Sequence, residues 1–327
     1  MAVALCNASY DSARLTFLRA VCAVTEGIAA VTASPTVTAA ALRDPRVCVL
    51  GGREGLPRSL GSVYAGSITR FLGGLRGVAV RRIFNRWDLA IETIAVSHDG
   101  AKLWAASRDH HKIHAFRVSD RKLLRTVGCE GRGELEFDDP CSVRAAATDD
   151  TVLVVETGNR RVQLLTAQLD FCGFVGDGTL VSPSDACAND AVVAVLDFPF
   201  HICLYSRRTG VFLHRFSGAP GSQMVSLMSM CFLRDELAMV DFVHDRIAVF
   251  SIHGVLRCHL GGGILKYPHR IACTKFDELV VVSNHFLSVL SASGDLLRTV
   301  KLRGLNDVAL HNGAVYALTS TKCLCVV

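Results

Sequence analysis

The chain has 327 residues, of which 50% are hydrophobic and 20% are charged, and it contains only eight prolines. This composition excludes a disordered tail or a proline-rich linker, because it supplies enough apolar residues for a sizeable core. The longest uncharged stretches, residues 27–42 and 217–233, are shorter than the roughly 20 apolar residues that a membrane span needs, and both contain proline. A membrane helix is therefore excluded.

The thirteen cysteines are an odd number and include no CxxC pair. This pattern fits neither a disulfide framework nor a zinc ribbon, and it favours reduced thiols. The first residues also lack a basic segment followed by an apolar one, so no secretory signal is predicted and a cytoplasmic location is expected. The net charge of +5 is concentrated in residues 43–88, which contain nine arginines and three acidic residues.

In chain order, the first predicted element is a single apolar strand at residues 2–6. Residues 52–85, which are rich in Gly and Arg, are then predicted to be an insertion between two repeat units. From residue 93 onward, units of four short apolar runs separated by turn residues predict four antiparallel strands, which we call a to d. These units occupy residues 93–128, 133–176, 184–218, 227–261, 269–303 and 306–327, the last with three runs only.

A stricter pattern marks the first strand of each unit, which lies nearest a crowded axis and therefore needs a small residue between two apolar ones. Seven triplets fit this position: 21–23, 94–96, 143–145, 186–188, 230–232, 271–273 and 308–310. Five of the six spacings between them lie near 43 residues, the length of one four-stranded propeller blade.

We therefore predict an all-β fold, a single-domain β-propeller of four-stranded blades spanning residues 1–327. Seven blades are favoured, and residues 1–6 then complete the blade formed by residues 306–327, because closure removes exposed sheet edges. Six blades are the alternative, in which residues 1–75 are an extension and residues 78–80 supply the closing strand.

The best-formed unit resembles the NHL-repeat family of β-propellers. The resemblance rests on residues 154–163, Val-Val-Glu-Thr-Gly-Asn-Arg-Arg-Val-Gln, preceded by Gly133, Phe137 and Pro140. It implies a non-catalytic binding scaffold for protein or RNA partners, without a cofactor. A minority of similar propellers are metal-dependent lyases or hydrolases with a site in the central channel, and this is the alternative function. The single Trp87-Asp88 pair is not interpreted as a WD repeat.

Polar residues in the turns and inner strands are the candidate binding residues of the propeller face and channel. Glu156 and Asp241 occupy the same place at the end of strand b, where a metal-dependent hydrolase would have acids. Leu196 takes that place in another unit and Asp197 is assigned out of register, so no full acidic ring and no metal site are predicted. The imidazoles of the b–c turns could bind an anion or a metal. The candidates are Arg144, Glu156, Asn159, Arg161, His201, Asp241, His244 and His285.

The basic segment is the strongest electrostatic feature of the sequence. Guanidinium groups pair with phosphates and carboxylates, and nearby aromatic residues can stack on bases, so the segment predicts binding to RNA or to an acidic protein surface. A solvated basic loop is the alternative. The arginines concerned are Arg53, Arg58, Arg70, Arg76, Arg81, Arg82 and Arg86.

Arg144 occupies the position where the other inner strands have Ala or Cys. A guanidinium near the propeller axis needs a partner, because an unpaired buried charge costs several kcal/mol. Three arrangements remain open: a carboxylate such as Glu156 or Asp185 pairs with it, an anion is held in the channel, or a local shift turns the side chain to solvent.

Overall fold

The computed structural model describes residues 80–85, 90–146, 149–199, 201–217, 227–283, 286–302, 304–311, 314–319 and 322–326. The chain divides into two compact units, residues 1–70 and 71–327, and every described residue belongs to the second. None of the described residues belongs to a helix that could cross a membrane.

The described strands form antiparallel sheets of four, which we number as blades in chain order. Blade 1 consists of β2 (Ile91–Val96), β3 (Lys102–Ser107), β4 (Lys112–Arg117) and β5 (Leu123–Val127). Blade 2 consists of β6 (Pro140–Ala145), β7 (Val152–Glu156), β8 (Arg161–Leu165) and β9 (Phe171–Val175). Blade 3 consists of β10 (Pro183–Ala188), β11 (Val192–Asp197), β12 (His201–Ser206) and β13 (Phe212–Ser217).

The second half of the propeller repeats this order. Blade 4 consists of β14 (Leu227–Leu233), β15 (Glu236–Asp241), β16 (Arg246–Ser251) and β17 (Leu256–Leu260). Blade 5 consists of β18 (Pro268–Cys273), β19 (Leu279–Ser283), β20 (Phe286–Leu290) and β21 (Leu296–Lys301). Blade 6 consists of β22 (Leu305–His311), β23 (Ala314–Thr319), β24 (Lys322–Val326) and, from the other end of the unit, β1 (Val80–Asn85).

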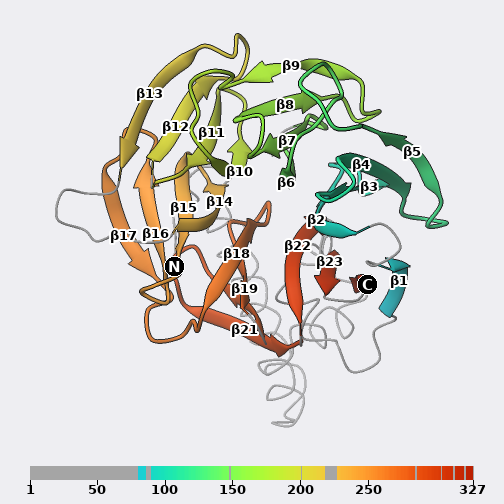
Figure 1. Cartoon of the computed structure of the whole chain (residues 1–327). Helices are drawn as coiled ribbons and strands as arrows, with labels where there is room; N and C mark the ends of the chain where they lie inside the picture. Colours follow the sequence, from blue (N-terminus) through green and yellow to red (C-terminus); the bar gives the residue numbers. More distant parts are fainter. Residues whose placement is uncertain are drawn as a thin grey trace, which may run out of the picture. The chain divides into compact units, whose positions relative to one another are not determined.

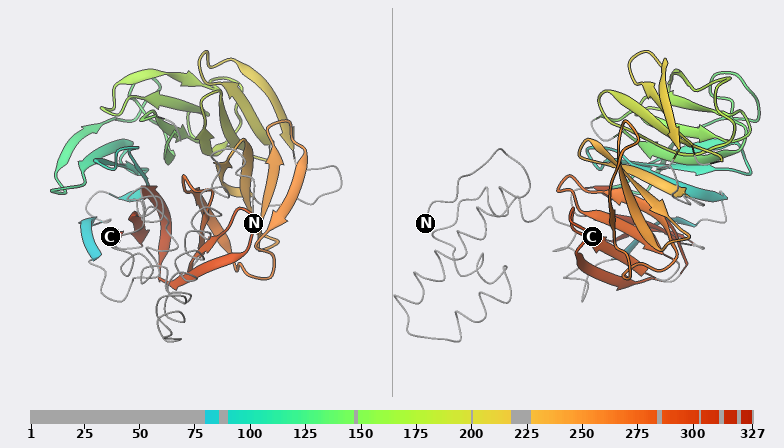
Figure 2. Two further views of the ribbon diagram at one scale, coloured as in Figure 1. Left: turned by 180° about the vertical axis from the view of Figure 1, so that it is seen from behind. Right: turned by 90° about the vertical axis from the view of Figure 1, so that its left-hand side faces the viewer.

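The sheets stand around a common centre, with β2, β6, β10, β14, β18 and β22 innermost, and together they form a β-propeller (Figure 1). Figure 2 shows the same arrangement from behind and from the side. The all-β prediction is confirmed, and six of the seven predicted triplets lie in innermost strands.

The described residues form six blades, which corresponds to the alternative count and not to the favoured seven. Blade 6 takes its outer strand from β1, whose residues pair with β24, for example Val80 with Val326. Residues 80–85 are thus a strand and not the end of an insertion. The strand predicted at residues 1–6, the triplet at 21–23 and the rest of the segment 52–79 lie outside the described residues.

The strand register places two sets of connections at opposite ends of the propeller. The start of strand a pairs with the end of strand b, as in Pro140 with Glu156, and the start of strand c pairs with the end of strand d, as in His201 with Ser217. All b–c turns and d–a loops therefore gather at one end, which we call the b–c face. The a–b and c–d turns form the opposite face.

The hydrophobic core lies in the seams between neighbouring blades. Side chains alternate along a strand, so an inner strand buries residues toward both neighbours. In blade 1, Ile94 packs toward blade 6 and Ala95 packs with Trp104 toward blade 2. The middle of strand b is therefore apolar, and β7 is buried throughout, from Val152 to the acid Glu156, whereas the outer strand β5 is exposed at four of five positions.

Candidate functional site

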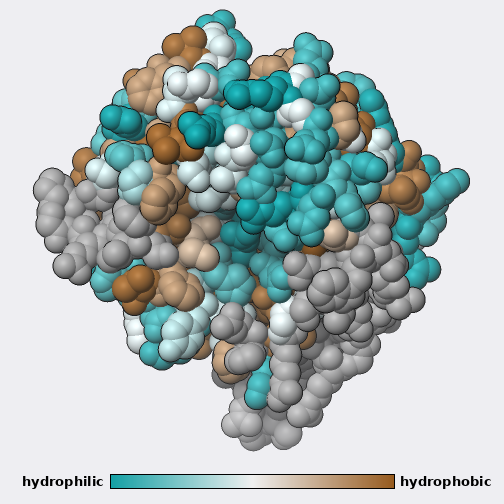
Figure 3. All heavy atoms as spheres, viewed as in Figure 1, coloured by the Kyte–Doolittle hydropathy of each residue, from teal (hydrophilic) through white to brown (hydrophobic). Residues whose placement is uncertain are grey.

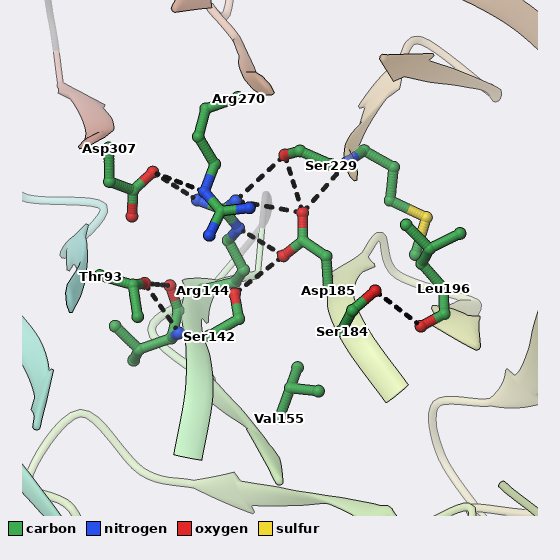
Figure 4. A network of polar contacts seen from close by, with 12 residues as sticks. Thr93, Ser142, Arg144, Val155, Ser184, Asp185, Leu196, Ser229, Arg270 and Asp307 are labelled. Carbon is green, nitrogen blue, oxygen red and sulfur yellow. Dashed lines mark hydrogen bonds and ion pairs between the residues drawn. The ribbon is translucent and has the colours of Figure 1, made fainter. Parts of the chain in front are cut away.

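Each innermost strand places one polar residue at the same level near the centre of the propeller, and we call these six residues the polar ring. Each is the third residue of its strand, next to a register shift with strand b. Figure 4 shows these side chains converging from different blades. The polar ring consists of Thr93, Ser142, Asp185, Ser229, Arg270 and Asp307.

Hydrogen bonds of the polar ring join each blade to the next. The amide of Val143 donates to Thr93 Oγ1 at 3.0 Å, and Ser142 Oγ donates to Asp185 Oδ1 at 2.8 Å. Further round, the amides of Met230 and Ile94 donate to Asp185 and Asp307, over 3.1 and 3.0 Å.

The last two seams close the circuit. The amide of Ile271 donates to Ser229 Oγ at 3.4 Å, and Arg270 Nε lies 3.7 Å from Asp307 Oδ1. Every seam between neighbouring blades is therefore bridged by a side chain of the ring, which fixes the inner strands relative to one another.

Arg144 spans the centre of the polar ring (Figure 4). Its Nε and Nη2 donate to the two oxygens of Asp185 at 2.9 and 3.1 Å, and its Nη1 donates to Asp307 Oδ1 at 3.3 Å. Nη2 also donates to Ser229 Oγ at 3.2 Å. The side chain, 12% exposed, thus connects blade 2 with blades 3, 4 and 6.

The ion pair with Asp185 is one of the arrangements expected for Arg144, and the structure assigns the other expected acid, Glu156, to a different arginine. Burial alone would lower the pKa of Arg144, but the carboxylates of Asp185 and Asp307 raise it. Burial conversely favours a higher pKa for Asp185, and the Arg144 charge holds that pKa below its usual value. Both groups are therefore charged at neutral pH, and each neutralises the other.

Glu156 belongs to a second buried cluster, at the b–c end of blade 2. It accepts hydrogen bonds from Asn159 Nδ2 at 2.6 Å, Arg161 Nε at 2.9 Å and Gln163 Nε2 at 3.0 Å. Arg161 also donates to the backbone carbonyls of residues 132, 133 and 136, and its guanidinium lies 4.0 Å from the ring centre of Phe174. The resemblance motif thus anchors the loop before β6, and its side chains Glu156, Asn159, Arg161 and Gln163 are buried.

Asp241 holds the corresponding position in blade 4. It accepts from His244 Nδ1 and Arg246 Nε, both at 2.9 Å, and these two partners are partly exposed. Asp197 holds the position in blade 3, because it pairs with Pro183 as Glu156 pairs with Pro140.

The sequence-based register of Asp197 was therefore wrong by one residue. β11 begins at Val192, but its pairing with β10 begins one residue later, at Val193. An alignment of the repeat units on the first residue of strand b therefore displaces the end of β11 by one residue. The carboxylate of Asp197 accepts from the amides of residues 181 and 182. Three consecutive blades thus use a buried acid to fix a neighbouring loop or turn.

The b–c face differs between the two halves of the propeller. In blades 1 and 2 the described turns and loops of this face, up to residue 180, expose charged residues such as Arg108, Asp109, Lys112, Arg132 and Arg160 and no large apolar side chain. In blades 3 to 5 the same face exposes large apolar side chains. These are Val181, Phe198, Met228, Val243, Ile264, Tyr267 and Phe286, and we call them the apolar rim.

Contacts between turns and loops support the apolar rim. The ring of Phe242 lies 6.1 Å from that of Tyr267, and the Tyr267 amide donates to Asp245 at 2.6 Å. In blade 3, the amide of Phe198 donates to the Ser182 carbonyl at 3.1 Å. Figure 3 shows one face of the molecule, on which hydrophobic residues lie mainly over β12 to β17 and hydrophilic residues gather over β6 to β9.

The remaining predicted residues are placed as follows. His201 is the first residue of β12 and is partly exposed. Arg81 and Arg82 lie in β1, and the other predicted arginines of the basic segment, together with His285 and Trp87-Asp88, lie outside the described residues. Among the described His, Cys, Asp and Glu residues, no group of three is arranged to hold one metal ion.

Of the polar ring, sequence reasoning named only Asp185 and missed the other five residues, although a signal was present. Six of the predicted triplets follow directly after a residue with a side-chain donor or acceptor: Thr93, Ser142, Asp185, Ser229, Arg270 and Asp307. A polar residue that recurs directly before each buried triplet indicates that these residues lie at the same height along the propeller axis and bind one another.

Comparisons by sequence found neither a protein-family model nor a curated protein that matches the chain. Solved structures match in shape. A structure of U3-55K superimposes with a TM-score of 0.59 at 10% identity, covering 76% of this chain and 98% of that one. The RRP9 WD40 repeats give a TM-score of 0.58 at 10% identity, covering 76% and 99%. At this identity the likeness establishes the β-propeller fold alone.

Proposed function

We propose that the propeller is a non-catalytic scaffold that binds a protein partner through the b–c face of blades 3 to 5. The observation that carries the proposal is the apolar rim, seven large exposed apolar side chains on one face of three consecutive blades. Single exposed apolar residues are ordinary, but a group on one face is typical of an interaction surface.

The buried polar residues predicted as site residues bind to other parts of the propeller, and this favours a binding scaffold over the alternative of an enzyme. The carboxylates of Glu156 and Asp185 accept hydrogen bonds from their own or neighbouring blades, and Arg144 donates four to side chains of other blades. A catalytic acid or base needs access to substrate, and these buried groups instead join strands and loops. The solved neighbour RRP9 is described by its WD40 repeats, and both this likeness in fold and the NHL resemblance favour a binding role.

RNA binding through residues 53–86 is a second candidate, favoured by the high density of arginine in that segment. Neutralising several phosphates releases counterions, so binding of this kind weakens steeply with salt. Substitution of Arg53, Arg58 and Arg70 tests it without changing β1. Affinity for single-stranded RNA that is unaffected by salt or by these substitutions excludes the candidate.

The chain offers a matched pair of valines for testing the protein-binding proposal. Val243 lies in the b–c turn of blade 4 and is 55% exposed, whereas Val255 lies in the c–d turn of the same blade, on the opposite face, and is 54% exposed. We expect V243D to lose the partners that the wild-type protein captures from a cell extract, and V255D to retain them.

The captured partner is then purified and its affinity measured for both variants. Loss of at least tenfold in V243D alone supports the proposal. Equal binding by the two variants, or a loss in V255D alone, contradicts it.

A further inference from the structure

Arg270 differs from its neighbour Arg144 in how far the protein satisfies it. Both guanidinium groups approach Asp307, but Arg144 makes four hydrogen bonds to side chains of the polar ring. Among the described residues, Arg270 makes one hydrogen bond, from Nη1 to the Met228 carbonyl at 3.2 Å. Its Nε is buried without a hydrogen-bond partner, 3.7 Å from Asp307.

The Asp307 oxygen that lies nearest to Arg270, Oδ1, is already used by other donors. It accepts from Arg144 Nη1 and from the Val308 amide, and Oδ2 of the same carboxylate accepts from the Ile94 amide. A carboxylate oxygen has two lone pairs, so Oδ1 is filled. Arg270 therefore keeps N–H groups that require an acceptor from elsewhere.

Arg270 also reaches the surface, since its side chain is 20% exposed. The bond to Met228 shows where it emerges, because Met228 is the second residue of β14, close to the b–c end, and its side chain belongs to the apolar rim. Tyr267, another member of the rim, comes three residues before Arg270 in the chain. The Arg270 guanidinium, which has N–H groups without an acceptor, thus lies beside residues of the apolar rim.

We propose that Arg270 binds a carboxylate side chain, Asp or Glu, of an extended partner segment whose flanking apolar residues lie on the apolar rim. This inference rests on the proposed function and names the chemistry of the partner. A planar guanidinium binds a carboxylate through two parallel hydrogen bonds, which gives both affinity and direction.

A carboxylate fits this position better than a phosphate. The charges of the polar ring and Arg144 balance, with two arginines and two aspartates, and Asp307 lies beside Arg270. A dianion would face that aspartate with only one exposed guanidinium to compensate it. The neighbouring His269 adds no charge at neutral pH, because burial lowers its pKa.

The test selects peptides from a random phage-displayed library on the full chain. We expect a consensus with Asp or Glu at one fixed position between apolar residues. We expect the peptides selected on R270Q to keep the apolar residues of this consensus but to have no preference for Asp or Glu at the fixed position. K266Q is the matched control, since it removes an exposed cation of the same face that pairs with Asp245, and it is expected to select the wild-type consensus.

A synthetic consensus peptide provides the decisive measurement on the wild-type protein, so the test does not depend on the folding of R270Q. Replacing its acid by Gln is expected to weaken binding at least about tenfold, the loss of a charge-assisted hydrogen bond. A consensus without an acid, an acid that R270Q still selects, or tighter binding of a phosphoserine version overturns the inference. Failure of any peptide to bind, with V243D unimpaired in partner capture, overturns the proposed function itself.

Discussion

The polar ring and the apolar rim invert the usual distribution of residues, in which polar side chains are exposed and large apolar side chains are buried. At the centre, charged and hydroxyl side chains are buried or partly buried, and all of them except Arg270 are satisfied by partners from other blades. On the b–c face of blades 3 to 5, large apolar side chains are exposed. The first inversion is compensated within the chain, and the second is compensated only when something covers it. The comparison therefore separates residues that build the propeller from residues that serve a partner.

Removing the cation at the centre is expected to have the largest effect. In R144M the carboxylates of Asp185 and Asp307 stay buried without their shared partner, and breaking a buried ion pair in this way costs about 3–5 kcal/mol. Denaturant unfolding of R144M and R144A measures the loss. A stability equal to that of the wild-type protein would mean that the ring does not hold the blades together.

The two acid clusters offer a graded version of the same test. E156Q removes the charge that faces the buried Arg161, and we expect a loss of about 3 kcal/mol. D241N faces Arg246 and His244, which are partly exposed and therefore solvated by water, and we expect a loss of about 1 kcal/mol.

Both substitutions are compared by their unfolding midpoints under identical conditions. The order of the two losses is the informative result. If D241N were the more damaging variant, burial of the partner would not be what determines the strength of these clusters.

The pH dependence of stability distinguishes satisfied from unsatisfied polar groups inside the propeller. His114 donates or accepts at Nδ1 with Thr126, but its buried Nε2 has no partner, and burial with the nearby Lys112 lowers its pKa to about 4. Between pH 6.5 and pH 4, His114 binds a proton in the unfolded chain but stays neutral in the folded protein, so the free energy of unfolding falls as the pH decreases. We expect about 2–3 kcal/mol over this window.

H114Q serves as the control, because it retains a polar side chain but does not titrate. Its stability is expected to change less than that of the wild-type protein between pH 7 and pH 5. The Asp185 pair behaves differently: its depressed pKa preserves its contribution until the pH falls below about 4, the value of a free Asp. Equal pH profiles for H114Q and the wild-type protein would contradict this assignment.

The smallest effect on stability is expected at the apolar rim. V243D changes an exposed side chain that is not part of the core, so its unfolding free energy is expected to stay within about 0.5 kcal/mol of the wild-type value. V255D is expected to behave in the same way. A large destabilisation by V243D would show that the rim contributes to folding, and would remove the contrast with the polar ring.

The repeating strands could be predicted from the sequence because each inner strand must fit the same crowded position. Six triplets identified that position, but the triplet at residues 21–23 has the same pattern and raised the blade count by one. The favoured count did not assign β1 as a strand, because Arg81 and Arg82 give it the composition of a basic loop, whereas the six-blade alternative placed a closing strand at residues 78–80, and β1 begins at Val80. An outer strand borders solvent and tolerates charged residues, so composition does not distinguish it from a loop.

The centre of the propeller was predicted in part. The need of a buried guanidinium for a carboxylate identified Asp185, which lies 41 residues from Arg144 on the next blade. Asp307 lies 163 residues away on blade 6, and only the closure of the ring brings it to the same guanidinium. The apolar rim left no periodic signal, since the exposure of Val243 or Tyr267 depends on the conformation of irregular loops.

Hydrogen exchange of the full chain, with and without the captured partner, tests the central claim most directly. We predict that the partner slows exchange in the b–c turn of blade 4, residues 241–246, and in the loop at residues 261–267. Exchange in the c–d turn at residues 251–255 is expected to stay unchanged. Protection confined to residues 251–255 and the other turns of that face would contradict the assignment of the b–c face as the binding surface.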